Sequence, residues 1–312
     1  MEDKSLMRPL PIVLDTDIGN DPDDLLALAM VLDRTDLFEL RGIVTTGKEP
    51  ALRARFASCL CCVAGRSDIP VAIGCDTPLS HSPSDFHLRF FSARGLPEHV
   101  AELISWEELM AQLTPDVTVV TIGPLTTLAT WLREFPGGTS RLGKVVSMGG
   151  FVTRRKRKPV GEYNFGIDAE ATRIVLRLSS RHICVTKNVC NGARMVPTDL
   201  DRLPMGETTA ARSWAFDFMR VWFAKRDCKV LYDPLTLATA LLPEYMDLQP
   251  VEFDMSDDSP IARMSARILA SGNRLATVGR TPTDLTWFEE ILYGCSQSPS
   301  CAPEQTHCGS GE

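Results

Sequence analysis

The segment from Ile12 to Leu32, IVLDTDIGNDPDDLLALAMVL, constrains the fold more than any other part of the chain. It opens with an apolar run that is typical of a buried strand. It ends with LLALAMVL, which is apolar on nearly all sides and is typical of a helix packed into a core. Gly19 and Pro22 indicate a tight connection between the two. This order predicts the first unit of an α/β fold.

The connection between that strand and helix is crowded with carboxylates. They are Asp15, Asp17, Asp21, Asp23 and Asp24. In α/β proteins, ligands bind where parallel strands end. Helix capping relieves the mutual repulsion by only about 0.3–1 kcal/mol per charge. A bound divalent cation would relieve the rest, and oxygen ligands favour Ca²⁺ or Mg²⁺. Turn and capping chemistry alone is the alternative. An EF-hand is excluded, because the twelfth loop position counted from Asp15 is Leu26 rather than Glu.

Apolar strand patterns alternate with helical patterns along the rest of the chain. Strands are predicted at 38–46, 68–73, 117–122, 144–148 and 182–186, and helices at 52–64, 128–135, 168–178, 209–226, 235–242 and 284–292. This alternation predicts βαβ units and a parallel sheet. Gly123 and the pair Gly149-Gly150 follow two of the strands, where backbone can approach a ligand. We expect one domain over residues 1–294 and a disordered tail over 295–312.

The bulk properties exclude several classes of protein. The chain has 312 residues and a net charge of -7, which argues against a nucleic-acid binder. No run of about 18 apolar residues predicts a membrane span. The first eleven residues lack the apolar core of a signal peptide. Ten cysteines in such a chain predict reduced thiols and a cytoplasmic location. The basic cluster at 153–159 is either an anion contact, a nuclear-localisation-like patch or a solvated loop.

Short motifs in a fixed order carry a resemblance to a known family. They are Asp15-Thr16-Asp17-Ile18-Gly19 with Asp23-Asp24, PVAIG at 70–74, IGPLT at 122–126, MGG at 148–150, EYN at 162–164 with DAEA at 168–171, and DPL at 233–235. Together they resemble the inosine–uridine-preferring nucleoside hydrolases, and the match is distributed over much of the chain. The resemblance implies a Rossmann-like, mostly parallel sheet flanked by helices.

The resemblance also implies a site and its occupants. A Ca²⁺ ion would be held by the carboxylates of Asp17, Asp24 and Asp233 and by the backbone carbonyl of Ile122. The ribose hydroxyls of a nucleoside would be held by Asp23, Glu162 and Asn164. Asp17 stands at the position of the general base. The family further implies a small-molecule nucleoside substrate and a homodimer or homotetramer.

Five positions depart from the family pattern. Asp21 belongs to a two-residue extension. It could join the metal ligands or replace Asp23, but we favour a position that faces solvent or lies behind the metal ligands. Lys48 and Lys156 stand about where ribose-binding asparagines are common, and Thr127 replaces the Asn of GPLTN. Tyr232 stands where some members have a histidine acid, so it is the candidate leaving-group catalyst. A neutral tyrosine is a poor acid at pH 7, and stacking on the base is its alternative role.

The chemistry of N-glycosidic hydrolysis fits this residue set. A bound cation acidifies water, a carboxylate takes the proton, and neighbouring carboxylates stabilise a cationic ribose transition state. Two other hypotheses stay open. One is a non-catalytic, nucleoside-binding member of the family. The other is a haloacid-dehalogenase-like Mg²⁺ phosphatase, which Asp15-Thr16-Asp17 resembles although its downstream acidic motif is missing.

Overall fold

The computed structural model describes most of the chain. The described residues are 8–19, 21–80, 101–135, 137–152, 162–179, 181–202, 209–254, 265–268, 276–279 and 284–293. The basic cluster at 153–159, most of the segment 78–95 and the tail 295–312 therefore lie outside or largely outside the described residues. Lys156 falls in the same group.

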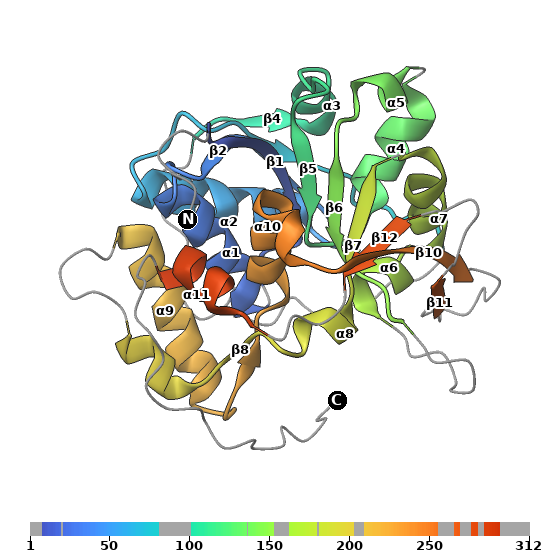
Figure 1. Ribbon diagram of the computed structural model, residues 1–312. Coiled ribbons are helices and arrows are strands. Elements are labelled where there is room, and N and C mark those ends of the chain that lie inside the picture. The colour runs from blue at the N-terminus through green and yellow to red at the C-terminus, as the bar shows by residue number, and fades with distance from the viewer. Residues whose placement is uncertain are drawn as a thin grey trace.

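A mostly parallel sheet forms the centre of the molecule (Figure 1). Within the described residues its strand order is β11-β10-β12-β7-β6-β5-β1-β2-β3-β4. The strands are β1 (Leu10–Thr16), β2 (Phe38–Thr45), β3 (Val71–Ile73), β4 (Leu103–Ser105), β5 (Thr118–Thr121), β6 (Val145–Met148), β7 (His182–Val185), β10 (Leu248–Asp254), β11 (Ser265–Ile268) and β12 (Ala276–Gly279). All neighbours from β12 to β4 pair in parallel, whereas β10 pairs antiparallel with β12 and β11.

Helices cover both faces of this sheet. They are α1 (Pro22–Asp33), α2 (Pro50–Val63), α3 (Trp106–Met110), α4 (Thr126–Glu134), α5 (Gly138–Arg141), α6 (Tyr163–Gly166), α7 (Ala169–Leu178), α8 (Lys187–Cys190), α9 (Ala210–Phe223), α10 (Tyr232–Leu241) and α11 (Thr286–Tyr293). Helices α1, α2 and α10 lie on one face, with α9 packed outside α1, and α4 and α7 lie together on the other (Figure 1). The predicted α/β class with a flanked, Rossmann-like sheet is confirmed.

The strand order reverses between β1 and β5, and this reversal determines where a ligand can bind. The chain runs from β1 to β2, β3 and β4 in one direction across the sheet, and from β5 to β6 and β7 in the other. The connections that leave β1 and β5 therefore diverge to opposite faces. A crevice at the carboxyl edge of such a switch point is the usual ligand site of an open α/β sheet.

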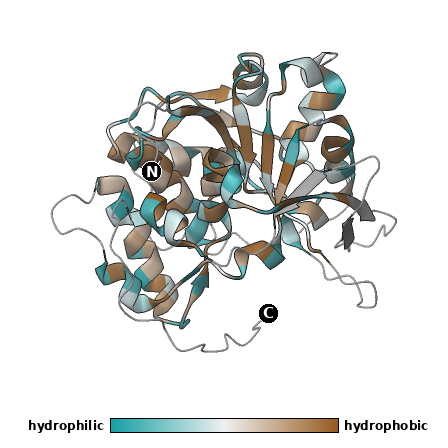
Figure 2. Cartoon of the chain, in the orientation of Figure 1, coloured by the Kyte–Doolittle hydropathy of each residue, from teal (hydrophilic) through white to brown (hydrophobic). Residues whose placement is uncertain are grey.

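The core explains why β1 and α1 sit at the centre. Leu14 in β1 and Leu28 in α1 are fully buried, and every residue of α1 from Pro22 to Leu32 is buried. Figure 2 shows apolar residues concentrated in the central strands and the inner sides of the helices. Each fully buried Leu or Ile side chain contributes about 1.5–3 kcal/mol to folding relative to exposure. The first segment of the sequence is thus anchored on both sides of its acidic turn.

The structure differs from the sequence-based expectations in several strands, three examples of which follow. β3 begins at Val71 rather than at residue 68. β4 was not predicted, because three residues are too few to show a period. The short antiparallel pair of β8 (Arg194–Met195) and β9 (Lys229–Val230) was also missed, since its strands are separated by α9.

Two further observations concern the bulk predictions. None of the described helices combines the length and apolar character needed to cross a bilayer. Six cysteines of the described part are free thiols, but Cys228 is disulfide-bonded. The expectation of reduced thiols is therefore wrong at Cys228.

Candidate metal and nucleoside site

A pocket of about 620 Å³, including its open mouth, lies at the switch point. It is built from the connections after β1 and β5, the end of β6, and the first residues of α1, α6, α8 and α10. All eight residues singled out from the sequence line it: Asp17, Asp23, Asp24, Ile122, Glu162, Asn164, Tyr232 and Asp233. Asp21, Met148, Tyr163 and Lys187 complete the lining. Asp15 is buried at the end of β1 and does not line the pocket.

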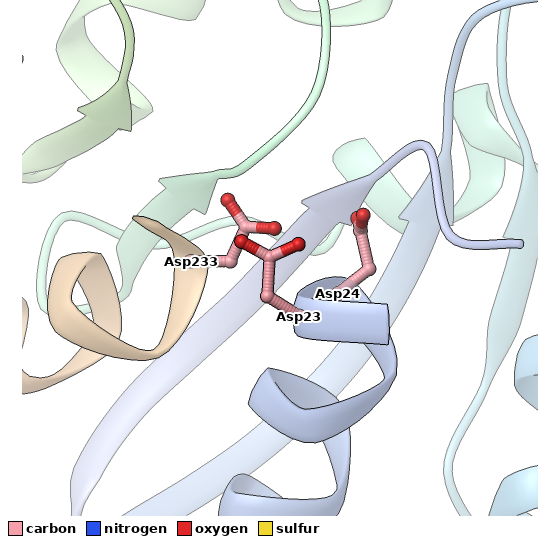
Figure 3. Close-up of side chains that lie close together, drawn as sticks. All are labelled: Asp23, Asp24 and Asp233. Atoms are coloured by element: carbon pink, nitrogen blue, oxygen red, sulfur yellow. The ribbon is translucent and has the colours of Figure 1, made fainter. Parts of the chain in front are cut away.

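Three carboxylates from two distant segments meet in this pocket. Asp23 and Asp24 open α1 and Asp233 opens α10, and one oxygen of each lies within 4.8 Å of the others (Figure 3). All three are buried. Asp17 is not part of this trio, although it lines the same pocket. The geometry therefore brings Asp24 and Asp233 together as expected and adds Asp23 to them.

The electrostatics of this cluster call for a positive charge. Burial raises the pKa of Asp24 well above its ordinary value, and repulsion from Asp17 and Asp23 raises it further. Burial and the charges of Asp23 and Asp24 likewise raise the pKa of Asp233. A divalent cation among these oxygens would remove the repulsion and hold the carboxylates ionised. Buried carboxylates and a backbone carbonyl are the donors that hard cations prefer.

The turn after β1 is held in place by a buried arginine that the sequence analysis did not single out. The Arg53 guanidinium, in α2, donates to the backbone oxygens of Asp17 and Ile18, the latter at 3.0 Å. Its Nε donates to the Lys48 oxygen at 2.8 Å. Arg53 is 2% exposed, so these bonds form in a dry environment where loss of a partner is costly. Lys48 itself is exposed.

Two glycines permit the close packing of this turn. Gly19 has a φ of 125°, a conformation that side chains disfavour. A Cβ on Gly123 would lie 2.8 Å from the Asp17 nitrogen and 3.0 Å from Asp17 Oδ1. The connections after β1 and β5 can touch only because position 123 lacks a side chain. This contact places Asp17 beside Ile122.

The EYN motif lines the same pocket and is fixed by hydrogen bonds. The Glu162 carboxylate caps α6, accepting from Gly150 N at 2.8 Å, Asn164 N at 2.9 Å and Phe165 N at 3.0 Å. Asn164 Nδ2 donates to the Ile122 oxygen at 3.0 Å. A carbonyl oxygen has two lone pairs, so Ile122 keeps one for a further partner.

Two cations near the pocket were missed from the sequence. Lys187, at the start of α8, lines the pocket. It stands two residues after the end of β7, which is the signal that could have identified it. Lys229, in β9, contacts Asp21 and lies 3.0 Å from Asp23 Oδ1. Burial lowers the pKa of Lys229, but attraction to Asp23 and Asp21 outweighs burial and raises it.

Tyr232 lies between the two acidic segments. Its backbone nitrogen donates to Asp23 Oδ2 at 3.2 Å, and its side chain is half-buried at the pocket wall. Burial raises the pKa of Tyr232 to about 12, with smaller opposing effects from Lys229 and nearby acids. A phenol with this pKa is a weak proton donor at neutral pH. The contact role with a base is therefore better supported than the acid role.

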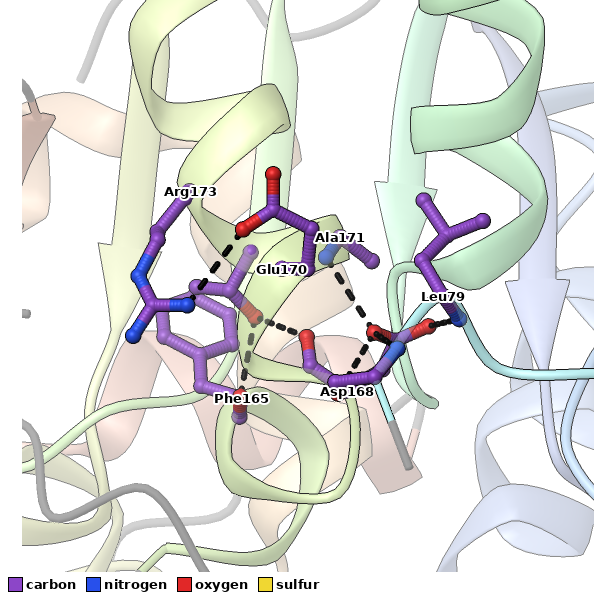
Figure 4. A network of polar contacts seen from close by, with 8 residues as sticks. Leu79, Phe165, Asp168, Glu170, Ala171 and Arg173 are labelled. Carbon is purple, nitrogen blue, oxygen red and sulfur yellow. Dashed lines mark hydrogen bonds and ion pairs between the residues drawn. The ribbon is translucent and has the colours of Figure 1, made fainter. Parts of the chain in front are cut away.

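Asp168, from the DAEA motif, is a structural hub rather than part of the pocket. Its carboxylate accepts from Leu79 N at 2.9 Å and from Ala171 N at 3.2 Å (Figure 4). It also accepts from Thr126 Oγ1 at 2.8 Å and from Ser80 N and Oγ. These bonds join the chain after β3 to the starts of α4 and α7.

Comparison with known proteins identifies the family. The family model described as inosine-uridine preferring nucleoside hydrolase matches residues 12–287. The chain belongs to this family. A pyrimidine-specific ribonucleoside hydrolase RihA of Shewanella oneidensis is 30% identical over 262 residues, covering 77% of this chain and 80% of that protein. RihA of Photobacterium profundum is 28% identical over 259 residues, covering 75% and 80%.

Solved structures of nucleoside hydrolases share the fold. A plant nucleoside hydrolase, PpNRh1, superposes with a TM-score of 0.71 at 20% identity and covers 92% of this chain and 100% of its own. An inosine-guanosine nucleoside hydrolase superposes with a TM-score of 0.74 at 21% identity, covering 90% and 97%. The nucleoside hydrolase fold expected from the sequence is confirmed, and the family match favours nucleoside hydrolysis over the phosphatase hypothesis.

Proposed function

We propose that the protein hydrolyses the N-glycosidic bond of ribonucleosides to a free base and ribose, with Ca²⁺ bound beside the sugar. The observation that carries this proposal is the convergence of Asp17, Asp24, Asp233 and the Ile122 carbonyl on one pocket in a chain of the nucleoside hydrolase family. These four groups would hold the cation. When bound, the cation would orient a water molecule and lower its pKa.

Asp17 is the proposed general base. Its carboxylate lines the pocket beside Asp24, and its backbone oxygen accepts a hydrogen bond from the Arg53 guanidinium. Ca²⁺ acidifies water only modestly, so a carboxylate that accepts the proton contributes to the rate. The water oxygen then bonds to the anomeric carbon of the ribose as the bond to the base nitrogen breaks. The negative charges of the pocket stabilise the cationic character of the ribose in that transition state.

Asp23, Asn164 and Glu162 are the proposed ribose-binding residues. Asp23 and Asn164 both line the pocket. Asn164 is oriented by its bond to the Ile122 oxygen, which couples the sugar-binding amide to the proposed metal ligand. Glu162 uses its carboxylate oxygens on three backbone N–H groups, so it fixes the α6 turn and leaves one or more lone pairs for a hydroxyl.

Tyr232 is the proposed contact of the leaving base. The ring lines the pocket wall and its pKa of about 12 supports stacking against a heterocycle more than protonating one. Removing the ring should therefore raise KM for nucleosides more than it slows turnover of bound substrate.

A panel of purine and pyrimidine ribonucleosides, assayed for released base and ribose, tests the proposed function. Hydrolysis that is abolished by a chelator and restored by Ca²⁺ is expected. Base release that persists after complete metal removal would contradict the role of the cation. Nucleoside binding without turnover would instead establish the non-catalytic member, and phosphate release from phosphate esters would establish a phosphatase.

The oligomeric state and location of the protein follow as smaller proposals. The family resemblance favours a homodimer or homotetramer, which sedimentation of the purified chain measures directly. Free thiols such as the buried Cys59, Cys61 and Cys184 are compatible with the proposed cytoplasmic location. Cell fractionation tests that location.

A further inference from the structure

A buried lysine, Lys229, lies behind two carboxylates of the pocket lining, Asp21 and Asp23, and belongs to none of the family motifs. The Lys229 side chain is 3% exposed. Its ammonium contacts Asp21 and lies 3.0 Å from Asp23 Oδ1. An unpaired ammonium is strongly disfavoured in such a dry position, so its carboxylate partners are needed for it to remain there.

Two aromatic rings and a strand pairing hold Lys229 in position. The ammonium lies 4.9 Å from the centre of the Trp222 ring and 5.4 Å from that of Tyr232, distances that favour cation–π attraction. Its backbone, in β9, pairs with Met195 in β8. A short strand pair and two aromatic rings therefore hold the cation where two carboxylates meet.

Both carboxylate oxygens of Asp23 therefore have a partner. Oδ1 pairs with Lys229, and Oδ2 accepts from the backbone nitrogen of Tyr232 at 3.2 Å. Its neighbour Asp24 has a different partner, since Asp24 Oδ1 accepts from Thr16 Oγ1 at 2.6 Å. Adjacent aspartates at the start of α1 are thus assigned to different neighbours, one to a protein cation and one to the turn after β1.

We propose that Lys229 is a positioning residue that neutralises Asp21 and Asp23, directs Asp23 away from metal coordination and holds its carboxylate ready for the ribose. The trio of nearby carboxylates includes Asp23, which by distance alone could bind the metal. Because Lys229 is bound to Asp23, the metal ion is coordinated by Asp17, Asp24 and Asp233. The ribose part of this inference rests on the proposed function.

Asp21 is the second carboxylate partner of Lys229. Its side chain is 33% exposed, and it shares the lysine with Asp23. Burial raises the pKa of Asp21, but attraction to Lys229 and hydrogen bonds to its neighbours outweigh burial and lower it. Asp21, Asp23 and Lys229 therefore form one charged unit beside the pocket.

The test replaces Lys229 with methionine, which keeps the length of the side chain and removes its charge. In K229M, the Ca²⁺ dissociation constant measured by titration calorimetry should fall about tenfold, because an uncompensated negative charge is added beside the metal ligands. KM for a hydrolysed ribonucleoside should rise about tenfold, with a smaller change in kcat, because Asp23 is no longer held. K229R should restore both values towards those of the native protein.

Opposite shifts in the two affinities separate positioning from simple damage. A distorted pocket would weaken Ca²⁺ and nucleoside binding together, and that result would overturn the proposal, as would an unchanged Ca²⁺ affinity. Lys225→Met is the matched control, because Lys225 is an exposed lysine of the same segment. It should leave the Ca²⁺ affinity unchanged, and a tenfold gain there as well would overturn the proposal by showing a nonspecific charge effect.

A second variant decides the matter if K229M does not fold. In Asp21→Asn, Lys229 loses half of its compensation, so the Ca²⁺ affinity should fall several-fold, and unchanged or tighter binding would overturn the inference. The calorimetric readout also separates this inference from the proposed function. A native protein that hydrolyses no nucleoside would refute the function, whereas the Ca²⁺ titrations would still decide the role of Lys229.

Discussion

The hydroxyl of Thr16 donates a hydrogen bond to Asp24 Oδ1 at 2.6 Å. This bond joins the last residue of β1 to the first turn of α1 across the acidic connection. The same hydroxyl accepts from Ile18 N at 3.0 Å, so one side chain organises both the turn and a proposed metal ligand. Thr16 is fully buried, which makes this bond strong and its loss costly.

Replacement of Thr16 by valine should weaken metal binding more than folding. Valine keeps the shape and the strand preference of threonine and removes only the hydroxyl. We expect the Ca²⁺ dissociation constant to rise about 10- to 100-fold, as is usual when a group that orients a metal ligand is lost. Thr130→Val is the matched control, since Thr130 is a buried threonine whose hydroxyl bonds within α4. Equal Ca²⁺ affinities of Thr16→Val and native protein would refute the orienting role.

Replacement of Asp17 by alanine should remove most of the catalytic activity. Loss of a general base lowers kcat on the order of 10²–10⁴-fold. Released base is measured at saturating nucleoside and Ca²⁺, after circular dichroism shows that the variant is folded. Turnover at the native rate by folded Asp17→Ala would eliminate Asp17 as the base and direct attention to the other carboxylates of the pocket.

Replacement of Arg53 by methionine should destabilise the turn that carries Asp17. The backbone oxygens of Asp17 and Ile18 would each lose a donor in a buried environment, and that of Lys48 would lose one in a partly buried environment. We expect a loss of about 3 kcal/mol in the free energy of unfolding. Denaturant titration measures it, and Arg55→Met, at an exposed position of the same helix, is the control. Arg53→Met with native stability would show that these hydrogen bonds contribute nothing.

The buried histidine His182 should make the stability of the protein depend on pH. This histidine lies in β7, with Nε2 2.7 Å from Ser147 Oγ and Nδ1 3.1 Å from Ser179 Oγ. Burial lowers its pKa from 6.5 to about 3. Between these two pH values His182 is therefore neutral in the folded state and protonated in the unfolded state.

The sign of the resulting pH dependence follows from proton binding. Between about pH 6.5 and 3 the unfolded state binds the additional proton, so the free energy of unfolding falls as the pH falls, by up to about 1.4 kcal/mol per pH unit. Above about pH 6.5 both states are neutral and His182 contributes no slope. Denaturant titrations at pH 7, 6 and 5 should show a shallower decline for His182→Gln than for the native chain. Identical slopes would contradict the buried neutral histidine.

Much of the fold was predictable from local patterns. The apolar runs at Ile12–Leu14 and Val117–Ile122 became β1 and β5, and the helical patterns became α1, α4, α7 and α10. Burial and periodicity are recorded in neighbouring residues, so a single sequence reveals them. The position of the site was predictable for the same reason, because parallel strands place their carboxyl ends at one edge.

The partners of the charged groups were not predictable in this way. Lys229 pairs with Asp21 and Asp23 only after β9 is placed beside the start of α1, and Arg53 reaches Asp17 only when α2 packs against the turn. The sequence also could not predict which three carboxylates lie closest together. Asp17 and Asp23 stand in the same short segment, and either could have joined Asp24 and Asp233.

By itself, therefore, the sequence determined the α/β architecture, the family and eight of the twelve residues that line the pocket. The tertiary structure decided which charges pair, which oxygens remain available to a cation and which side chain holds the acidic turn. The physical reason is the range of the forces involved. Strand and helix preferences act between neighbours in the chain, whereas the energies of buried charges depend on distances that only the folded chain sets.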